Sequence, residues 1–220
     1  MHTEKIRNMQ ESNARLDYGA YLKTHTAALH QQLDESPLLR ALLQPGLTRT
    51  SYARTLHVML KAHCAVEPLM LALEPSRPAT LKAYQSRQPL LKKELDRLGV
   101  LLAPDNSPTA TISQPTCPGN LYDDPSYYLG MRYVLEGATQ GSRFIYRSLM
   151  QHNPQLGVDN HSYWATLAAD TSTWQAICQQ LAPGNARLST HELLAGATLA
   201  FNLFINTFSA TQPDDKPPRL

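Results

Sequence analysis

LKTHTAALHQQL, residues 22–33, is the stretch around which the rest of the chain is organised. Its apolar residues, together with those just before it, recur at the spacing of a helix that buries one face. Lys23 and His30 are seven residues apart, nearly two helical turns, so they point the same way and lie about 10 Å apart along the axis. This spacing suits the edge and the centre of one planar ligand.

The chain has eight histidines, so the choice of His30 needs an argument. His25 lies five residues earlier, which places it about 140° around the helix, and the two rings cannot face one ligand. We expect His25 to face solvent. Asp34 follows His30 by one turn and can accept the proton of the far ring nitrogen, which would fix the tautomer. On an outward face, Asp34 would only help to end the helix, and Lys23 would be a solvated lysine.

Length and composition indicate one globular domain without a strong electrostatic field. A chain of 220 residues can bury a sizeable core. Its formal net charge of +2 predicts no nucleic-acid partner and no membrane-surface partner. Three widely separated cysteines favour a reducing compartment. We find no signal-peptide core and no run approaching the ~20 apolar residues of a membrane span, so we expect a cytoplasmic protein.

The order of segments predicts an all-α, single-domain bundle of about seven helices. We expect a polar lead-in at 1–16, a helical domain at 17–210 and a disordered tail at 211–220. Residues 103–120, rich in proline, are predicted to be a loop. In the second long helix, Thr48 is the expected N-cap, and the expected apolar side consists of Tyr52, Leu56, Met59, Leu60, Cys64 and Leu71. The helices are expected at 17–34, 48–73, 79–99 (one or two short ones), 122–152, 160–181 and 189–209.

Glycines interrupt one strongly helical segment, PSYYLGMRYVLEGATQGSRFIYRSLM, residues 125–150. Gly130, Gly137 and Gly141 fall along one face, and each interior glycine costs about 1 kcal/mol relative to alanine. Something must therefore approach this backbone closely. Either another helix packs on the glycine face or a flat ligand does.

Other chemistries have weaker support. His57, His63 and Glu67 include an HxxxE spacing that could ligate a metal, but a diiron centre would need ExxH pairs on several helices, and we find none. There is no GxSxG motif, no suggestive Cys–His dyad, no phosphate loop and no dinucleotide fingerprint.

Three segments resemble haem oxygenases. LKTHTAALHQQLDESPL, from residue 22, is similar to their N-terminal haem-binding helix. YVLEGATQGS, residues 133–142, is similar to the distal helix, in particular that of the bacterial, biliverdin-producing branch. ATLAFNLFINTF, residues 197–208, resembles the last core helix. The resemblance implies the haem oxygenase-like fold.

The resemblance also implies roles for individual residues. His30 would ligate the iron, with the catalytic distal face formed by Gly137, Gly141 and Ser142. The remaining haem contacts would come from Lys23, Thr26, Asp34, Tyr133 and Phe201. Two positions depart from the family pattern: Ser142 replaces a third glycine, and Ala138 replaces the aspartate of the mammalian pattern. The proton-delivery group is therefore open, with Thr139, Gln140 and Ser142 as candidates.

By this resemblance, the chain is expected to cleave haem with O₂, haem being both substrate and cofactor. The products would be biliverdin, CO and Fe²⁺. Electrons must come from another protein, a reductase or a ferredoxin, and a phytochrome is a candidate acceptor of biliverdin. One alternative is a non-catalytic haem carrier or sensor that lost turnover through Ala138 and Ser142. Another is an enzyme on the same scaffold acting on a different ligand, such as a thiaminase-like enzyme or a metal-dependent oxidase.

Overall fold

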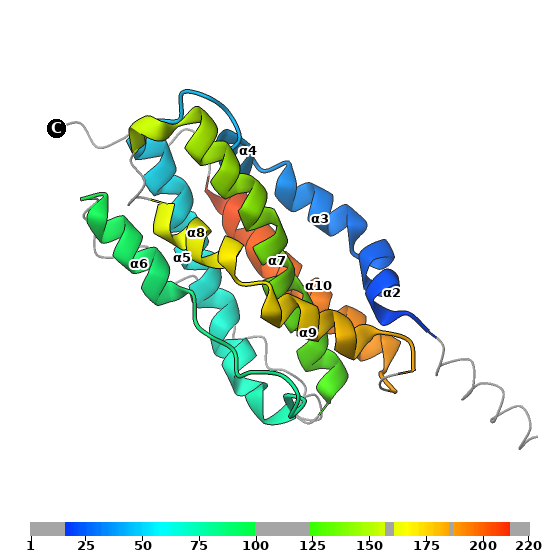
Figure 1. The fold of residues 1–220 in the computed structure, drawn as a ribbon. Coiled ribbons are helices and arrows are strands. Elements are labelled where there is room, and N and C mark those ends of the chain that lie inside the picture. The colour runs from blue at the N-terminus through cyan, green and yellow to red at the C-terminus, as the bar shows by residue number, and fades with distance from the viewer. Residues whose placement is uncertain (1–15, 100–123, 157–160, 185–186, 212–220) are drawn as a thin grey trace, which may run out of the picture.

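The computed structural model describes residues 16–99, 124–156, 161–184 and 187–211. Within these ranges the chain forms nine α-helices and two short 3₁₀ helices, with no strand, which confirms the predicted all-α fold (Figure 1). The helices are α2 (Tyr18–His25), α3 (Ala27–Asp34), α4 (Pro37–Ala41), α5 (Arg49–Ala72), η1 (Glu74–Ser76), α6 (Gln88–Arg97), α7 (Pro125–His152), η2 (Pro154–Leu156), α8 (Ser162–Ala169), α9 (Ser172–Leu181) and α10 (Thr190–Ala210).

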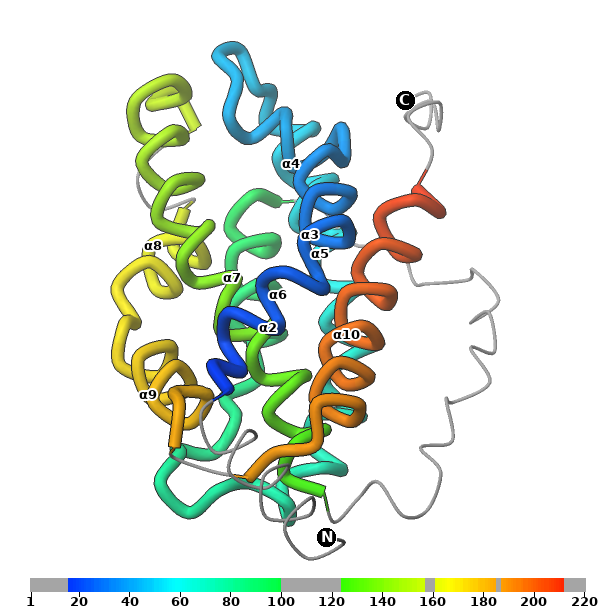
Figure 2. The backbone as a smooth tube through the Cα atoms, turned by 90° about the vertical axis from the view of Figure 1, so that its right-hand side faces the viewer, coloured from blue at the N-terminus to red at the C-terminus, as the bar shows by residue number. Residues whose placement is uncertain are grey.

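Helix α10 is the common support of the bundle. It packs against α7, α5, α3 and α2, and Figure 2 shows α3 in the foreground beside it, with α7 farther to the left. At the crossing with α7 the two backbones touch: a Cβ added to Gly130 would lie 2.0 Å from the carbonyl oxygen of Leu193. A Cβ on Gly196 would lie 2.2 Å from the carbonyl oxygen of Tyr127. Of the two explanations offered for the glycine face, close helix packing therefore applies to Gly130.

Helix α10 also qualifies as a membrane span by length and apolar composition, although we expected no run of that kind. Half of the qualifying window is buried inside the bundle. Its apolar side chains include Phe201, Phe204 and Phe208, all of which are buried. Such burial is typical of the core helix of a globular bundle, where a helix that is apolar on most sides meets several neighbours.

The single helix predicted at 17–34 is instead two helices, and this prediction was wrong. Thr26 leaves the helical region with φ −105° and ψ 2°, which separates α2 from α3. The Thr26 hydroxyl donates a 2.7 Å hydrogen bond to the carbonyl oxygen of Leu22. Such back-bonding by threonine often bends a helix. Asp17 caps the start of α2 by accepting a 2.8 Å hydrogen bond from the amide of Ala20.

The predicted apolar side of α5 was right for its first half and wrong for its second half. Thr48 caps the helix as expected, its hydroxyl accepting from the amide of Ser51. Cys64 and Leu71, however, are exposed, because the buried stripe continues through His63, Val66, Glu67 and Met70. Two of these residues are polar and would be assigned to the surface by hydropathy alone. They are buried because they have polar partners, described below.

The segment 160–181 also divides into two helices, α8 and α9. Asp170 ends α8 in an extended conformation, and its carboxylate accepts hydrogen bonds from Ser172 and Thr173 at the start of α9. Between 79 and 99 there is one helix, α6. The predicted loop at 103–120 lies outside the described residues, as do residues 1–15 and 212–220.

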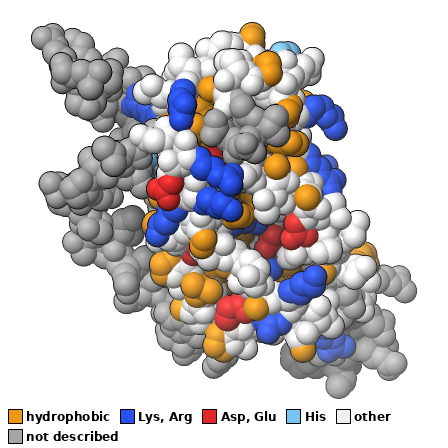
Figure 3. Space-filling view, turned by 60° about the vertical axis from the view of Figure 1, so that its left-hand side comes forward, with side chains coloured by type: hydrophobic (Ala, Val, Ile, Leu, Met, Phe, Trp, Pro, Cys, Tyr) orange, Lys and Arg blue, Asp and Glu red, His pale blue; other side chains and the backbone are white. Residues whose placement is uncertain are grey.

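The face over which α6 lies carries mixed charges. Figure 3 shows Lys and Arg side chains there interspersed with Asp, Glu and apolar side chains. No single kind of side chain covers the described part of this face, in keeping with a formal net charge of only +2.

Candidate functional site

His30 and Asp34 form a pair on α3. The His30 Nδ1 atom lies 2.8 Å from Oδ2 of Asp34, one helical turn later. This contact occupies one ring nitrogen and leaves Nε2 without a partner among the described residues. The side chain of His30 is 64% exposed, so the free nitrogen can be reached by a ligand. A carboxylate on the far nitrogen is the arrangement that orients a metal-binding imidazole.

Phe201 joins His30 to the core. The two rings meet edge to face with centroids 5.9 Å apart, and Phe201 is buried on α10. Phe201 therefore lies on the helix that packs against both the helix of the histidine, α3, and the helix of the glycines, α7. The structure gives no direct contact between His30 and Gly137 or Gly141.

Gly137 and Gly141 have different surroundings although they are one turn apart. Apart from its chain neighbours and the backbone of its own helix, a Cβ added to Gly141 would have no described atom within 4 Å. At Gly137 the added atom would lie 3.4 Å from Cζ3 of Trp174 on α9. Gly141 therefore presents open backbone, whereas an indole ring covers Gly137.

The structure turns Ser142 and Thr139 away from this open backbone. Ser142 is buried, about 100° around the helix from Gly141, and its hydroxyl donates a 2.8 Å hydrogen bond to the carbonyl oxygen of Ala138. The hydroxyl of Thr139 donates to the carbonyl oxygen of Glu136 at 2.6 Å. Gln140 donates to Thr139 at 3.3 Å. The three candidate proton donors are thus engaged along their own helix.

The remaining predicted site residues divide between surface and interior. Lys23 is exposed on α2. Thr26 is buried, and its hydroxyl is used within the helix break. Tyr133 is half-buried on α7, with its ring centroid 5.4 Å from that of Trp174, and burial raises the pKa of its hydroxyl. Sequence reasoning missed Trp174, because a single aromatic residue on an amphipathic helix has no distinguishing pattern.

A buried network of ionic side chains joins α7 to the segment before α6. Arg132, only 1% exposed, lies 3.0 Å from a carboxylate oxygen of Glu136 and 3.6 Å from one of Glu74. Arg87 donates to the second oxygen of Glu136 at 2.9 Å. These contacts commit Arg132 to the interior.

Glu67 on α5 extends the network, because it accepts hydrogen bonds from the hydroxyls of Tyr84 and Ser86 and from the amide of Arg87. Nδ1 of His63 lies 3.1 Å from Glu67. Burial alone would raise the pKa of Glu67, but the hydrogen bonds outweigh it and lower the pKa to about 2. Burial lowers the pKa of His63, so this ring is neutral. In the described residues, no group of three or more His, Cys, Asp or Glu could hold a metal ion.

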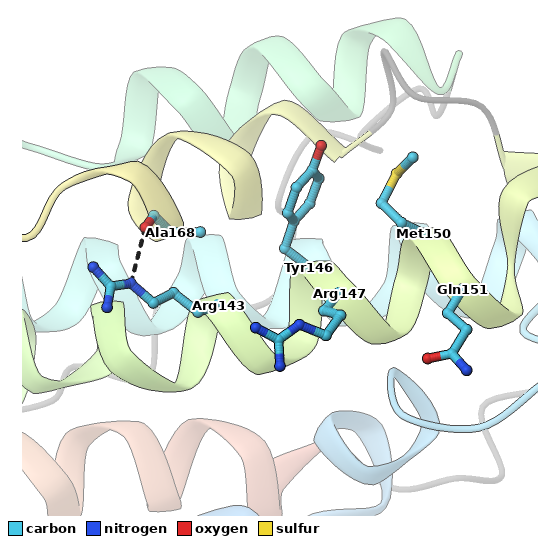
Figure 4. A pocket seen from close by; sticks show the side chains of 6 residues that line it. All are labelled: Arg143, Tyr146, Arg147, Met150, Gln151 and Ala168. Carbon is cyan, nitrogen blue, oxygen red and sulfur yellow. Dashed lines mark hydrogen bonds between the residues drawn. The ribbon is translucent and has the colours of Figure 1, made fainter.

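An open pocket of about 570 Å³ lies farther along α7, beside α8 (Figure 4). In Figure 4 the Arg143 side chain points to α8, where Nε donates a 3.0 Å hydrogen bond to the carbonyl oxygen of Ala168. Arg143 is about 160° around the helix from Gly141. The pocket has none of the predicted site residues in its lining, which is Arg143, Tyr146, Arg147, Met150, Gln151 and Ala168. It is therefore separate from the surroundings of His30.

Comparison with known proteins gives one positive finding. A family model described as heme oxygenase matches residues 17–210 of the chain. None of the curated proteins compared with the chain matches it. The matched range contains all the residues placed above, from α2 to the end of α10.

Proposed function

The chain belongs to the haem oxygenase family, and on this premise we propose that it cleaves haem to biliverdin, CO and Fe²⁺, using O₂ and electrons from a reductase or a ferredoxin. One observation carries the proposal. The exposed imidazole of His30 on α3 is paired through one ring nitrogen with Asp34, and α3 packs on α10, which also packs against α7 with its open backbone at Gly141. The family membership implies haem as the ligand; these residues suit it.

His30 is the proposed iron ligand, through Nε2. Asp34 holds the other ring nitrogen, so the imidazole enters the site in one tautomer and one orientation. Bound haem supplies the iron that activates O₂. Lys23, seven residues before His30 and on the far side of the break at Thr26, is the proposed partner of a propionate. Phe201, whose ring packs against His30, would contact the macrocycle from α10.

The bare backbone at Gly141 has a steric role in this proposal. It leaves room for a flat macrocycle to lie close to α7, with little height above the ring for a bound diatomic molecule. A diatomic molecule confined in this way is oriented along the ring, toward one bridging carbon. Orientation of reacting groups can lower a barrier by several kcal/mol.

The second candidate is a non-catalytic haem carrier or sensor. It is favoured by one observation: the hydroxyls of Ser142 and Thr139 are bonded to carbonyls of α7, and Ala138 has no polar side chain. If no other group delivers protons at this face, haem would bind without being cleaved.

For the oxygenase, we also propose a cytoplasmic location and a phytochrome as a user of biliverdin.

One experiment tests the proposal and separates the two candidates. Purified protein is titrated with hemin, the Soret band is recorded, and ferredoxin with its reductase, or ascorbate, is added in air. Wild-type protein should bind hemin and then develop biliverdin absorbance. His30→Ala should lose the spectrum of a histidine-ligated ferric haem, whereas His25→Ala, a matched exposed histidine on α2, should keep it.

The outcomes are distinct. Hemin binding without biliverdin would favour the carrier. An unchanged spectrum in His30→Ala would remove His30 from the iron, and absence of hemin binding by the wild type would refute both candidates.

A further inference from the structure

Helix α9 connects the two sides of the proposed haem site. It packs against α7 and also against α2, and Figure 1 shows it crossing the lower part of α7. The contact with α2 lies near Gly19, where an added Cβ would be 3.9 Å from Cβ of Leu181. Gly19 is one turn before Lys23, the proposed propionate partner. Helix α9 therefore joins α7, which carries the glycines, to α2, which carries Lys23.

Trp174 is the side chain that α9 places on the glycine face. Its six-membered ring lies over Gly137, with Cζ3 and Cη2 at 3.4 and 3.7 Å from the position of an added Cβ. The other side of the contact is Tyr133, whose ring is tilted 48° to the indole at a centroid distance of 5.4 Å. The indole thus packs against two residues of α7, one turn apart.

The boundary between covered and open backbone falls between the two glycines. Trp174 covers Gly137, and one turn later Gly141 has open space around it. A flat ligand lying on Gly141 would therefore meet the edge of the indole. The indole N–H has no hydrogen-bond partner among the described residues and could donate to a carboxylate at the ligand's edge.

From this arrangement we infer that Trp174 is the end wall of the haem site, and that it fixes the rotation of the macrocycle in its own plane and hence the bridging carbon that is cleaved. The inference rests on the proposed function, because it assumes that haem occupies the space over Gly141. Trp174 is a positioning residue in this scheme. It takes no part in the iron chemistry, and its loss should change where haem sits without removing the iron ligand.

The test uses Trp174→Ala and Trp174→Phe, with Gln175→Ala, an exposed neighbour on α9, as the matched control. Two readouts are compared: proton NMR of the haem methyl groups in the ferric cyanide complex, which needs no turnover, and the ratio of biliverdin isomers after turnover. We expect one dominant set of methyl resonances and one dominant isomer in the wild type and in Gln175→Ala. Trp174→Ala should show at least two sets of resonances and a mixture of isomers, and Trp174→Phe a smaller change of the same kind.

Each result decides something. Unchanged methyl resonances in Trp174→Ala refute the proposed role of Trp174 as the end wall of the haem site. If that variant does not fold, unchanged resonances in Trp174→Phe refute it. Haem binding without turnover refutes the proposed oxygenase activity, yet the resonances still decide the role of Trp174. Absence of haem binding by the wild type overturns both proposals.

Discussion

At the scale of single residues, the sequence predicted the spacing of side chains within a helix better than the surroundings of each side chain. The one-turn interval from His30 to Asp34 is a property of any helix, so it could be stated from the sequence alone. The two-turn relation expected between Lys23 and His30 assumed one continuous helix, and the break at Thr26 separates these residues onto α2 and α3. The orientation of Ser142 could not be predicted in this way. Which side of a helix faces a ligand depends on where the neighbouring helices pack, and the sequence shows no such neighbours.

Substitutions at Gly141 should separate folding from activity. Gly141→Ala adds a methyl group into open space in a helix, so the free energy of unfolding should rise by about 1 kcal/mol, measured by urea denaturation followed by circular dichroism. Gly141→Leu should also fold and load hemin, but its bulk over the iron should slow biliverdin formation. Full turnover by the leucine variant would contradict the steric role of the open backbone.

At the scale of helices, the long α7 and α10 were predicted closely, and the errors occur where a polar side chain interrupts a helix. Thr26 and Asp170 each divide a segment that we expected to be continuous. Their neighbours keep the helical apolar spacing, so periodicity gives no signal of a break. Local hydrogen bonds from threonine and aspartate side chains to the backbone compete with the helix at such positions.

The crossing of α7 and α10 predicts a large effect at a glycine far from any ligand. Gly130→Ala forces a methyl group against the backbone carbonyl of Leu193. It should therefore lower the free energy of unfolding by about 1–3 kcal/mol, the usual cost of overpacking. The same denaturation measurement applies, with Gly141→Ala on the same helix as the control. Equal stabilities of the two alanine variants would contradict the close crossing.

At the scale of the whole molecule, sequence reasoning noticed His63 and Glu67 only as residues whose spacing could ligate a metal, an interpretation with weak support. The structure uses them in a buried network that joins α5, the segment before α6 and α7 through Glu67, Arg87 and Glu136. These residues lie far apart in the chain, so their pairing depends on the completed fold. Burial of paired charges cannot be inferred from hydropathy, which assigns every charged side chain to the surface.

The network predicts a specific loss of stability in acid. Because the folded-state pKa of Glu67 lies below its ordinary value of 4.5, at about 2, the carboxylate stabilises the fold fully above pH 4.5 and loses that effect as the pH falls toward 2. The shift corresponds to about 3 kcal/mol. Glu67→Gln should lose stability of this order at pH 7 and show a shallower decline below pH 4.5. Denaturant unfolding at several pH values checks this.

The control for Glu67 is Asp96→Asn, which changes an exposed carboxylate on α6. It should leave the pH profile close to that of the wild type. A Glu67→Gln profile that runs parallel to the wild type between pH 5 and pH 2 would show that other carboxylates cause the acid unfolding.

The support of α3 and α7 by one helix has a geometric consequence. The separation of α3 from α7 depends on how closely each of these helices packs against α10. The packing of α7 on α10 is set by Gly130, beside the carbonyl oxygen of Leu193, and by Gly196, beside the carbonyl oxygen of Tyr127. Changes at Gly196 that the fold tolerates should therefore alter which macrocycle substituents the protein accepts, even though that residue touches no ligand.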